Sequence, residues 1–139
     1  MIKVEHLTKK YGERYAVNDI SFEVKKGEIV GFLGPNGAGK STTMNILTGY
    51  LSSTSGRAMI DGLDILEHPM AVKKKIGFLP EMPPLYLEMT VKEYLNFIYD
   101  LKKCTLNRRE HIAEICRVVK IADTMNRMIK NLSKGYRQR

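Results

Sequence analysis

The chain has 139 residues, 43% of them apolar, so it is long enough for one ordinary folded domain with a sizeable core. Its net charge is +8, but the basic residues are scattered and no aromatic residues are interleaved with them, so we expect no direct binding to nucleic acid. The two cysteines form no Cys-x-x-Cys pair and the three histidines lie far apart, which argues against a zinc-binding protein. The N-terminus has no signal-peptide core and no apolar run is long enough to span a membrane, which argues against secreted and membrane-spanning proteins. These features indicate a cytosolic chain.

The first stretch of the chain predicts β-structure. Apolar and polar residues alternate within residues 2–24, most clearly in ISFEV. A turn, KKGE, follows at residues 25–28. The next run, EIVGFLG at 28–34, is almost entirely apolar, which is typical of a strand buried on both faces.

A helix and two further β-elements are expected before residue 80. The helix begins in KSTTMNILTG and stops at or near Gly49. Asp61 and Gly62 stand between short apolar pieces, which predicts a β-hairpin, and residues 76–79 predict another strand, ended by Pro80. The residues that the helix would bury are Met44, Ile46 and Leu47.

The pattern becomes helical after a proline-rich connector near residue 81. Thr90 and Glu93 predict a capping box at the start of one helix, and a second helix is expected over about 107–120. The inward residues would be Tyr94, Leu95, Ile98 and Leu101 in the first helix, and Ile112, Ile115, Val118 and Val119 in the second. We therefore divide the chain into a β-rich part, 1–80, and a helical part, 81–139.

Residues 34–41 match the pattern G-x-x-x-x-G-K-[ST] between the predicted strand and the predicted helix. The glycines allow successive N–H groups to point inward, Lys40 can reach the β- and γ-phosphates, and the hydroxyl of Ser41 can ligate Mg²⁺. The alternative, a flexible glycine-rich surface turn, does not account for this context. The residues expected to contact nucleotide phosphates are Gly34, Pro35, Asn36, Gly37, Ala38, Gly39, Lys40, Ser41 and Thr42.

The whole chain resembles the first part of an ABC-type ATPase, the nucleotide-binding subunit of ABC transporters. The resemblance rests on four stretches in a fixed order. GPNGAGKST resembles the Walker A loop, KKYG the adenine-stacking A-loop, FLPE at 78–81 the Q-loop, and LSKGYRQR at 132–139 the family signature, usually Leu-Ser-Gly-Gly-Gln. The resemblance implies an α/β fold of the P-loop NTPase (ABC ATPase) type, incomplete, with an antiparallel β subdomain and a helical subdomain.

The resemblance also implies roles for three residues outside the Walker A loop. Tyr11 would stack on adenine; its plain alternative is an ordinary aromatic residue of a β-region. Ser133 and Gly135 would face the γ-phosphate of ATP bound by the other monomer of a head-to-tail dimer. For these two residues the plain alternative is a helix cap.

The chain departs from the family pattern at three positions. Lys134 stands where a second glycine is usual, Tyr136 where glutamine is usual, and Glu81 replaces the Q-loop glutamine. Glu81 can still attend Mg²⁺ through oxygen, but it is acceptor-only when ionised. Glu81 together with LSKG is similar to the export-type ABC-2 branch. By resemblance, Lys40 and Glu81 are the catalytic candidates, and Ser41 and Glu81 are the metal candidates.

The implied function is the ATP-hydrolysing energy subunit of an ABC transporter, with ATP and Mg²⁺ as cofactors. Its partners would be a second nucleotide-binding subunit, identical or not, and transmembrane permease subunits, which places it on the cytoplasmic face of the cell membrane. The Walker B aspartate, catalytic glutamate and switch histidine of the family have no counterpart in these residues. We therefore expect an N-terminal fragment that is inactive alone. A non-transport ABC-type ATPase of DNA repair or translation, and an inert nucleotide-binding fragment, stay open.

Overall fold

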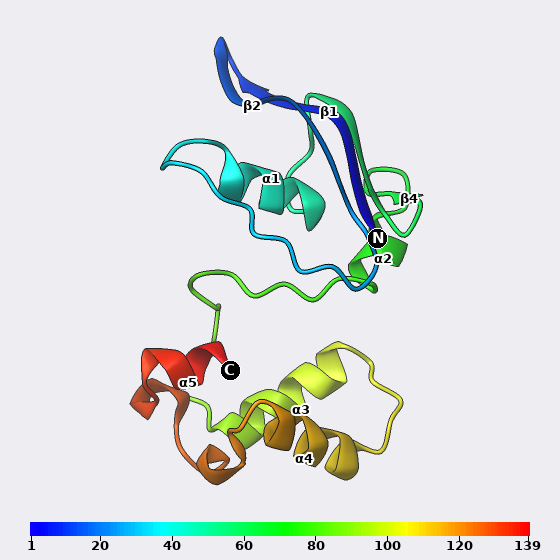
Figure 1. Cartoon of the computed structure of the whole chain (residues 1–139). Coiled ribbons are helices and arrows are strands. Elements are labelled where there is room, and N and C mark those ends of the chain that lie inside the picture. Colours follow the sequence, from blue (N-terminus) through cyan, green and yellow to red (C-terminus); the bar gives the residue numbers. More distant parts are fainter. The chain divides into compact units, whose positions relative to one another are not determined.

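The computed structural model describes all residues from 1 to 139. The chain divides into two compact units, Met1–Phe78 and Leu79–Arg139. The first unit contains the β-sheet and the second is helical (Figure 1). None of the helices combines the length and the hydropathy that a membrane crossing requires.

The sheet of the first unit has four antiparallel strands in the order β2-β1-β3-β4. The predicted β-structure near the N-terminus is confirmed as a long hairpin of β1 (Ile2–Tyr11) and β2 (Arg14–Val24). The predicted Asp61–Gly62 hairpin is also confirmed, between β3 (Ser55–Ile60) and β4 (Leu63–Asp64). Both of its turn residues have positive φ, 50° and 78°, as a two-residue turn between twisted strands requires.

The core of the first unit lies between the sheet and helix α1 (Lys40–Leu47), with α2 (Pro69–Lys73) beside it. The buried residues of this core are Val4, Leu7, Ile46, Leu47, Ala58, Ile60, Ile65 and Val72. The prediction for Met44 is wrong, because its side chain is exposed. Thr43 takes its place at the core, since residues 43, 46 and 47 share one face of the helix and Met44 lies about 100° from Thr43.

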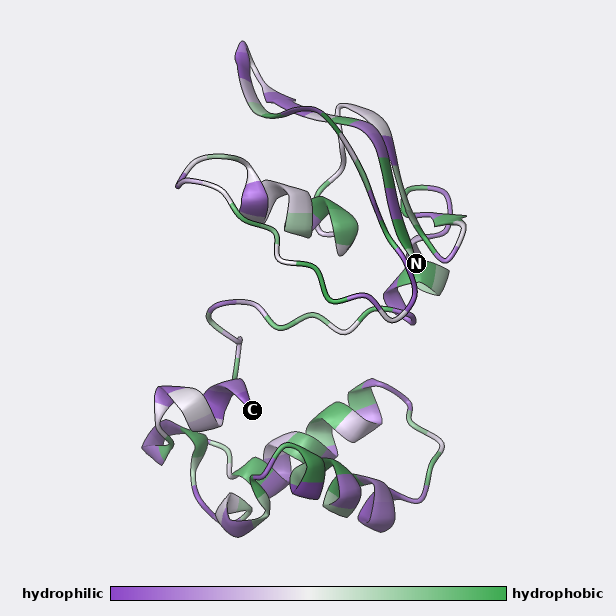
Figure 2. Cartoon of the chain, viewed as in Figure 1, coloured by the Kyte–Doolittle hydropathy of each residue, from purple (hydrophilic) through white to green (hydrophobic).

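The two strands predicted at residues 28–34 and 76–79 are not formed. Ile29 and Leu33 are almost fully exposed, and Phe78 and Leu79 are also exposed. Figure 2 shows the resulting apolar colour on irregular chain leading into α1. A strand needs a neighbour to accept its backbone hydrogen bonds, and no other segment of the chain pairs with these residues.

The second unit is built on α3 (Val91–Leu101) and α4 (Arg108–Val118), followed by the short helices η1 (Ala122–Thr124), η2 (Ile129–Asn131) and α5 (Lys134–Gln138). The predicted capping box is confirmed: the Thr90 hydroxyl accepts a hydrogen bond from the Glu93 N–H at 3.2 Å, and the Glu93 carboxylate accepts one from the Thr90 N–H at 2.8 Å. The buried core residues are Val91, Cys116, Ile121, Ile129 and Leu132.

Some of the inward residues predicted for these two helices are wrong. Leu101, Ile115 and Val118 are exposed, whereas the sulfur-bearing Cys116 is buried. Ile112, Cys116 and Val119 are spaced at i, i+4 and i+7, so they form the single face of α4 that meets the core. Sequence periodicity did not distinguish this face from the neighbouring one, because both carry aliphatic residues.

Candidate functional site

The glycine-rich loop at residues 34–39 leads directly into α1. Gly37 and Gly39 have φ angles of 85° and 88°, in the left-handed region where a side chain is unfavourable. Gly39 also lies against β2: a Cβ atom on it would be 2.2 Å from the Ala16 carbonyl oxygen and 3.1 Å from Val17 Cγ2. A Cβ on Gly37 would meet nothing within 4 Å. Gly39 is therefore required by backbone and packing, and Gly37 by backbone alone.

The N-terminus of α1 is left open by this loop. Its N-cap residue is Gly39, so no side chain caps the helix, and its first turn carries no acidic residue. The first-turn N–H groups of a helix have no partner within the helix, and they carry the positive end of its dipole. This end of α1 therefore offers hydrogen-bond donors and partial positive charge to an anion.

Lys40 adds a full positive charge to the loop. Its Nζ donates hydrogen bonds to the carbonyl oxygens of Gly34 at 2.6 Å and Pro35 at 2.8 Å, so the ammonium group lies over the loop itself. The neighbouring Ser41 is exposed, and Asn36 lies in the turn at the exposed tip of the loop. The arrangement combines a cation, open helix amides and a hydroxyl group in one short stretch of chain.

Thr43 fastens the helix to the loop, a role the sequence analysis missed. It is fully buried, its hydroxyl donates to the Gly39 carbonyl at 3.0 Å, and its N–H donates to the same oxygen at 2.8 Å. The Ala38 N–H in turn donates to the Pro35 carbonyl at 3.2 Å. Each of these hydrogen bonds restricts the backbone conformation of the loop and so holds its glycines in place.

A cavity of about 330 Å³ lies beside the loop, between it and β2. Its lining residues are Tyr15, Ala16, Val17, Asn18, Ile20, Phe32, Gly37, Ala38 and Thr43. Only Gly37 and Ala38 were among the predicted site residues. The alternation of apolar and polar residues in β2 could have indicated that one face of the strand meets a core. The sequence could not indicate that β2 borders the loop, because this depends on the packing of Gly39 against Ala16.

Tyr11 does not line this cavity. It ends β1, it is exposed, and the Lys9 ammonium lies 5.2 Å from the centroid of its ring. A ring already engaged by a cation on one side still has a second face for stacking. Its contact with adenine therefore stays a prediction.

The remaining predicted residues, Glu81, Ser133 and Gly135, belong to the second unit. Glu81 is exposed, and its backbone carbonyl accepts a hydrogen bond from Gln138 Nε2 at 3.2 Å. Ser133 is the N-cap of α5, accepting from the Tyr136 N–H at 3.4 Å, so the plain reading of a helix cap describes at least part of its role. A Cβ on Gly135 would meet nothing within 4 Å, so no neighbour in the chain explains a glycine there.

Two titratable groups of the second unit have shifted pKa values. Hydrogen bonds from the Thr90 backbone and hydroxyl hold the pKa of Glu93 below its usual value. Burial raises the pKa of the Cys116 thiol. The glycine-rich loop, in the first unit, offers an anion the Lys40 ammonium group and the backbone dipoles of α1.

Comparison with known proteins places the chain in a family. Residues 17–139 match the family described as ABC transporter. The chain is 35% identical over 142 residues to the probable multidrug ABC transporter ATP-binding protein YbhF of Escherichia coli, covering 100% of this chain and 24% of that protein. It is 33% identical over 139 residues to the bacitracin transport ATP-binding protein BcrA of Bacillus licheniformis, covering 100% of this chain and 45% of that protein.

Among solved structures, the chain is similar to a dimeric ATP-binding cassette in a post-hydrolysis state, bound to ADP and Pi. The TM-score is 0.80 at 27% identity, and the match covers 98% of this chain and 65% of that one. The chain thus spans about a quarter and a little under a half of these two curated relatives. Its antiparallel sheet and helical unit form part of a P-loop NTPase fold, as expected. The match over residues 17–139 and the fold together show that this chain belongs to the ABC transporter family, as part of an ATP-binding domain.

Proposed function

We propose that the full-length protein containing these residues binds and hydrolyses ATP as the energy subunit of an ABC transporter. One observation carries the proposal: the Lys40 ammonium group lies over a loop of left-handed glycines that opens the uncapped N-terminus of α1. Loop amides and a helix N-terminus combined with a lysine form a site for phosphate groups. Family membership supports the choice of ATP.

The loop amides and Lys40 would hold the β- and γ-phosphates, and Tyr11 would stack on the adenine ring. Lys40 would stabilise charge on the transferred phosphoryl group, which is the main task of the protein in this chemistry. Neither role requires a proton transfer from the loop. The 139 residues alone are expected to turn over no ATP, because they hold no counterpart of the family's Walker B aspartate and catalytic glutamate.

Mg²⁺ would be held by the Ser41 hydroxyl and the Glu81 carboxylate. Both groups supply oxygen, the ligand that Mg²⁺ prefers, and both side chains belong to exposed residues that no ion pair engages. The ion would neutralise charge on the β- and γ-phosphates. The chemistry of each oxygen group, taken separately, suits Mg²⁺.

The partners would be a second nucleotide-binding subunit and transmembrane permease subunits, with the protein held on the cytoplasmic face of the membrane. In such a dimer, Ser133 and Gly135 would face the nucleotide of the other subunit. The dimeric state of the related cassette and the open space at Gly135 support this arrangement. The similarity of Glu81 and LSKG to the ABC-2 branch favours export.

Lys40→Ala in the full-length protein tests the proposal. We expect the steady-state release of phosphate from ATP to be abolished, because the only cation of the loop is lost. Lys26→Ala is the matched control, since Lys26 is an exposed lysine of a turn in the same unit and forms no ion pair. Turnover by Lys40→Ala equal to that of the control would reject the phosphate-loop assignment.

A further inference from the structure

The connection between α3 and α4 forms a basic tip on the second unit. Residues 101–109 contain four basic side chains and no acidic one: Lys102, Lys103, Arg108 and Arg109. Leu101 and Leu106 stand in the same segment and are 62% and 57% exposed. Positive charge and exposed aliphatic surface therefore occur together within nine residues.

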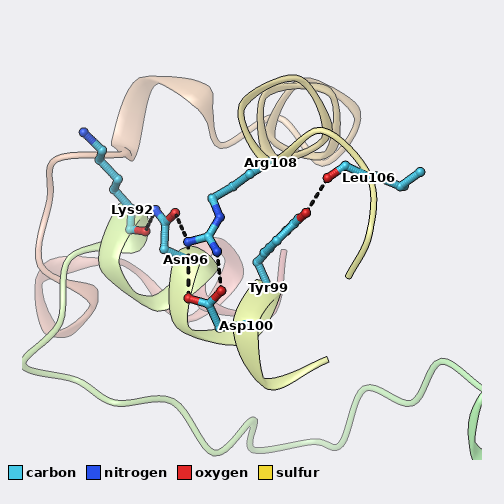
Figure 3. Close-up of polar contacts among 6 residues, drawn as sticks. All are labelled: Lys92, Asn96, Tyr99, Asp100, Leu106 and Arg108. Carbon is cyan, nitrogen blue, oxygen red and sulfur yellow. Dashed lines mark hydrogen bonds and ion pairs between the residues drawn. The ribbon is translucent and has the colours of Figure 1, made fainter. Parts of the chain in front are cut away.

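The tip is held in one shape by contacts between the two helices (Figure 3). The Tyr99 hydroxyl of α3 donates a hydrogen bond to the Leu106 carbonyl, and the Arg108 guanidinium lies 4.5 Å from the centroid of the Tyr99 ring. Arg108 also pairs with Asp100, with one N–O distance of 3.2 Å. Three contacts thus fix both ends of the connection, so its outward side chains are presented without a large ordering cost.

These contacts also determine which charged side chains of the tip have an ion-pair partner and which do not. Asp100, the nearest acidic residue before the tip, is neutralised by Arg108. Lys102, Lys103 and Arg109 take part in no ion pair. Three cations without an ion-pair partner therefore share this segment with the two exposed leucines, and one acidic residue, Glu110, follows it.

We propose that this tip, residues 101–109, contacts the surface of a membrane rich in anionic lipid, with Leu101 and Leu106 entering the headgroup layer. Lysine and arginine near such a surface are attracted to it, and aliphatic side chains beside them add burial at the headgroup boundary. A nucleic acid is a poorer match, since only one aromatic residue, Tyr99, lies near the tip, and its hydroxyl and one face of its ring are already engaged. An acidic protein surface would pair with the cations but would not bury the two exposed leucines.

The expected effect follows from the number of free charges. A basic residue near an anionic surface changes binding by about five-fold, so removing two lysines should weaken it by roughly thirty-fold. The effect should shrink in high salt, because the attraction falls off within a Debye length. The nucleotide site is not involved, so failure of this proposal would leave the proposed function standing.

Flotation of the full chain with vesicles tests the proposal. The probes are vesicles of phosphatidylcholine with about one third phosphatidylglycerol, and vesicles of phosphatidylcholine alone, as in tests of surface charge. We expect binding to the first and not to the second, and the double substitution Lys102→Gln with Lys103→Gln should remove most of it. The matched control is Lys25→Gln with Lys26→Gln, two exposed neighbouring lysines in the first unit, which should bind like the unmodified chain.

A fluorescence measurement keeps the test independent of charge substitutions. The chain contains no tryptophan, so Leu106→Trp introduces a single probe at the tip, and Leu66→Trp, at a residue with the same 57% exposure, introduces one in the other unit. The emission of Leu106→Trp should shift to the blue with anionic vesicles, and that of Leu66→Trp should not. Absence of binding, binding that ignores the tip lysines, an equal shift for both probes, or capture by polyglutamate or duplex DNA but not by vesicles would each overturn the proposal.

Discussion

Replacing Gly39 by alanine should destabilise the first unit much more than the same change at Gly37. The two glycines stand two residues apart in one loop, and both have φ near 85°. An alanine forced into this region costs about 1–2 kcal/mol, and this cost is common to both sites. The gain from restricting the unfolded chain is also common to both, so it cancels in the comparison.

The two sites differ in what the new methyl group would meet. At Gly39 the methyl carbon would be 2.2 Å from the Ala16 carbonyl oxygen, more than 1 Å closer than ordinary contact. Either the loop or β2 must move, and overpacking of this kind costs about 1–3 kcal/mol. At Gly37 the space is open. We therefore expect Gly39→Ala to lose about 2–5 kcal/mol of unfolding free energy, and Gly37→Ala about 1–2 kcal/mol.

Equilibrium unfolding in urea, followed by far-ultraviolet circular dichroism, measures the difference. With a slope of about 2 kcal/mol/M, the two midpoints should differ by about 1 M. The slopes should agree, because neither substitution changes the surface exposed on unfolding. Equal midpoints for the two variants would refute the reasoning, since the predicted difference rests on the contact between Gly39 and β2.

Three other predictions concern Tyr11, the capping box and the cysteines. Tyr11→Ala in the full-length protein should weaken ATP binding by about ten-fold, or 1.4 kcal/mol. Equal ATP affinities of the variant and the unmodified protein, measured by calorimetry, would mean that Tyr11 is an ordinary aromatic residue of the β-region. Because the pKa of Glu93 is lowered in the fold, its stabilisation is present above its unfolded pKa of about 4.3 and is lost as the pH falls through the folded value. The unmodified chain should therefore lose more stability on acidification than the Glu93→Gln variant. Urea midpoints that fall equally with pH for the two proteins would contradict this. In the same assay at neutral pH, Thr90→Ala should lower the unfolding free energy by about 0.5–2 kcal/mol. Finally, Cys104 should react with Ellman's reagent before Cys116, which is 2% exposed and has a raised pKa, and simultaneous reaction of both thiols would disprove the burial of Cys116.

Local chemistry made several elements of this chain predictable. The Asp61–Gly62 turn needs two left-handed residues, and aspartate followed by glycine is one of the few pairs that accept them. The capping box needs only Thr90 and Glu93 at the right spacing. The loop before Lys40 is similar, because its glycines are required by the backbone itself.

Burial could not be read in the same way. An apolar run predicts a strand only if another strand is present to pair with it, and residues 28–34 have none, so Ile29 and Leu33 are exposed. Ile115 and Cys116 are adjacent on α4, and only the position of the neighbouring helices decides that Cys116 is the buried one. Periodicity describes a helix face, but it does not say which face meets a partner.

By itself the sequence determined the glycine loop, the lysine at its end, the Asp61–Gly62 hairpin and the helix starts, since each depends on residues close together in the chain. Only the tertiary structure decided that Gly39 packs against Ala16 and that Tyr15 and Phe32 border a cavity beside the loop. It also decided that Arg108 forms an ion pair with Asp100, while the neighbouring basic residues form none. The physical reason is that backbone conformation is set by local sterics, whereas contact, burial and charge pairing depend on which distant segment arrives next to a residue.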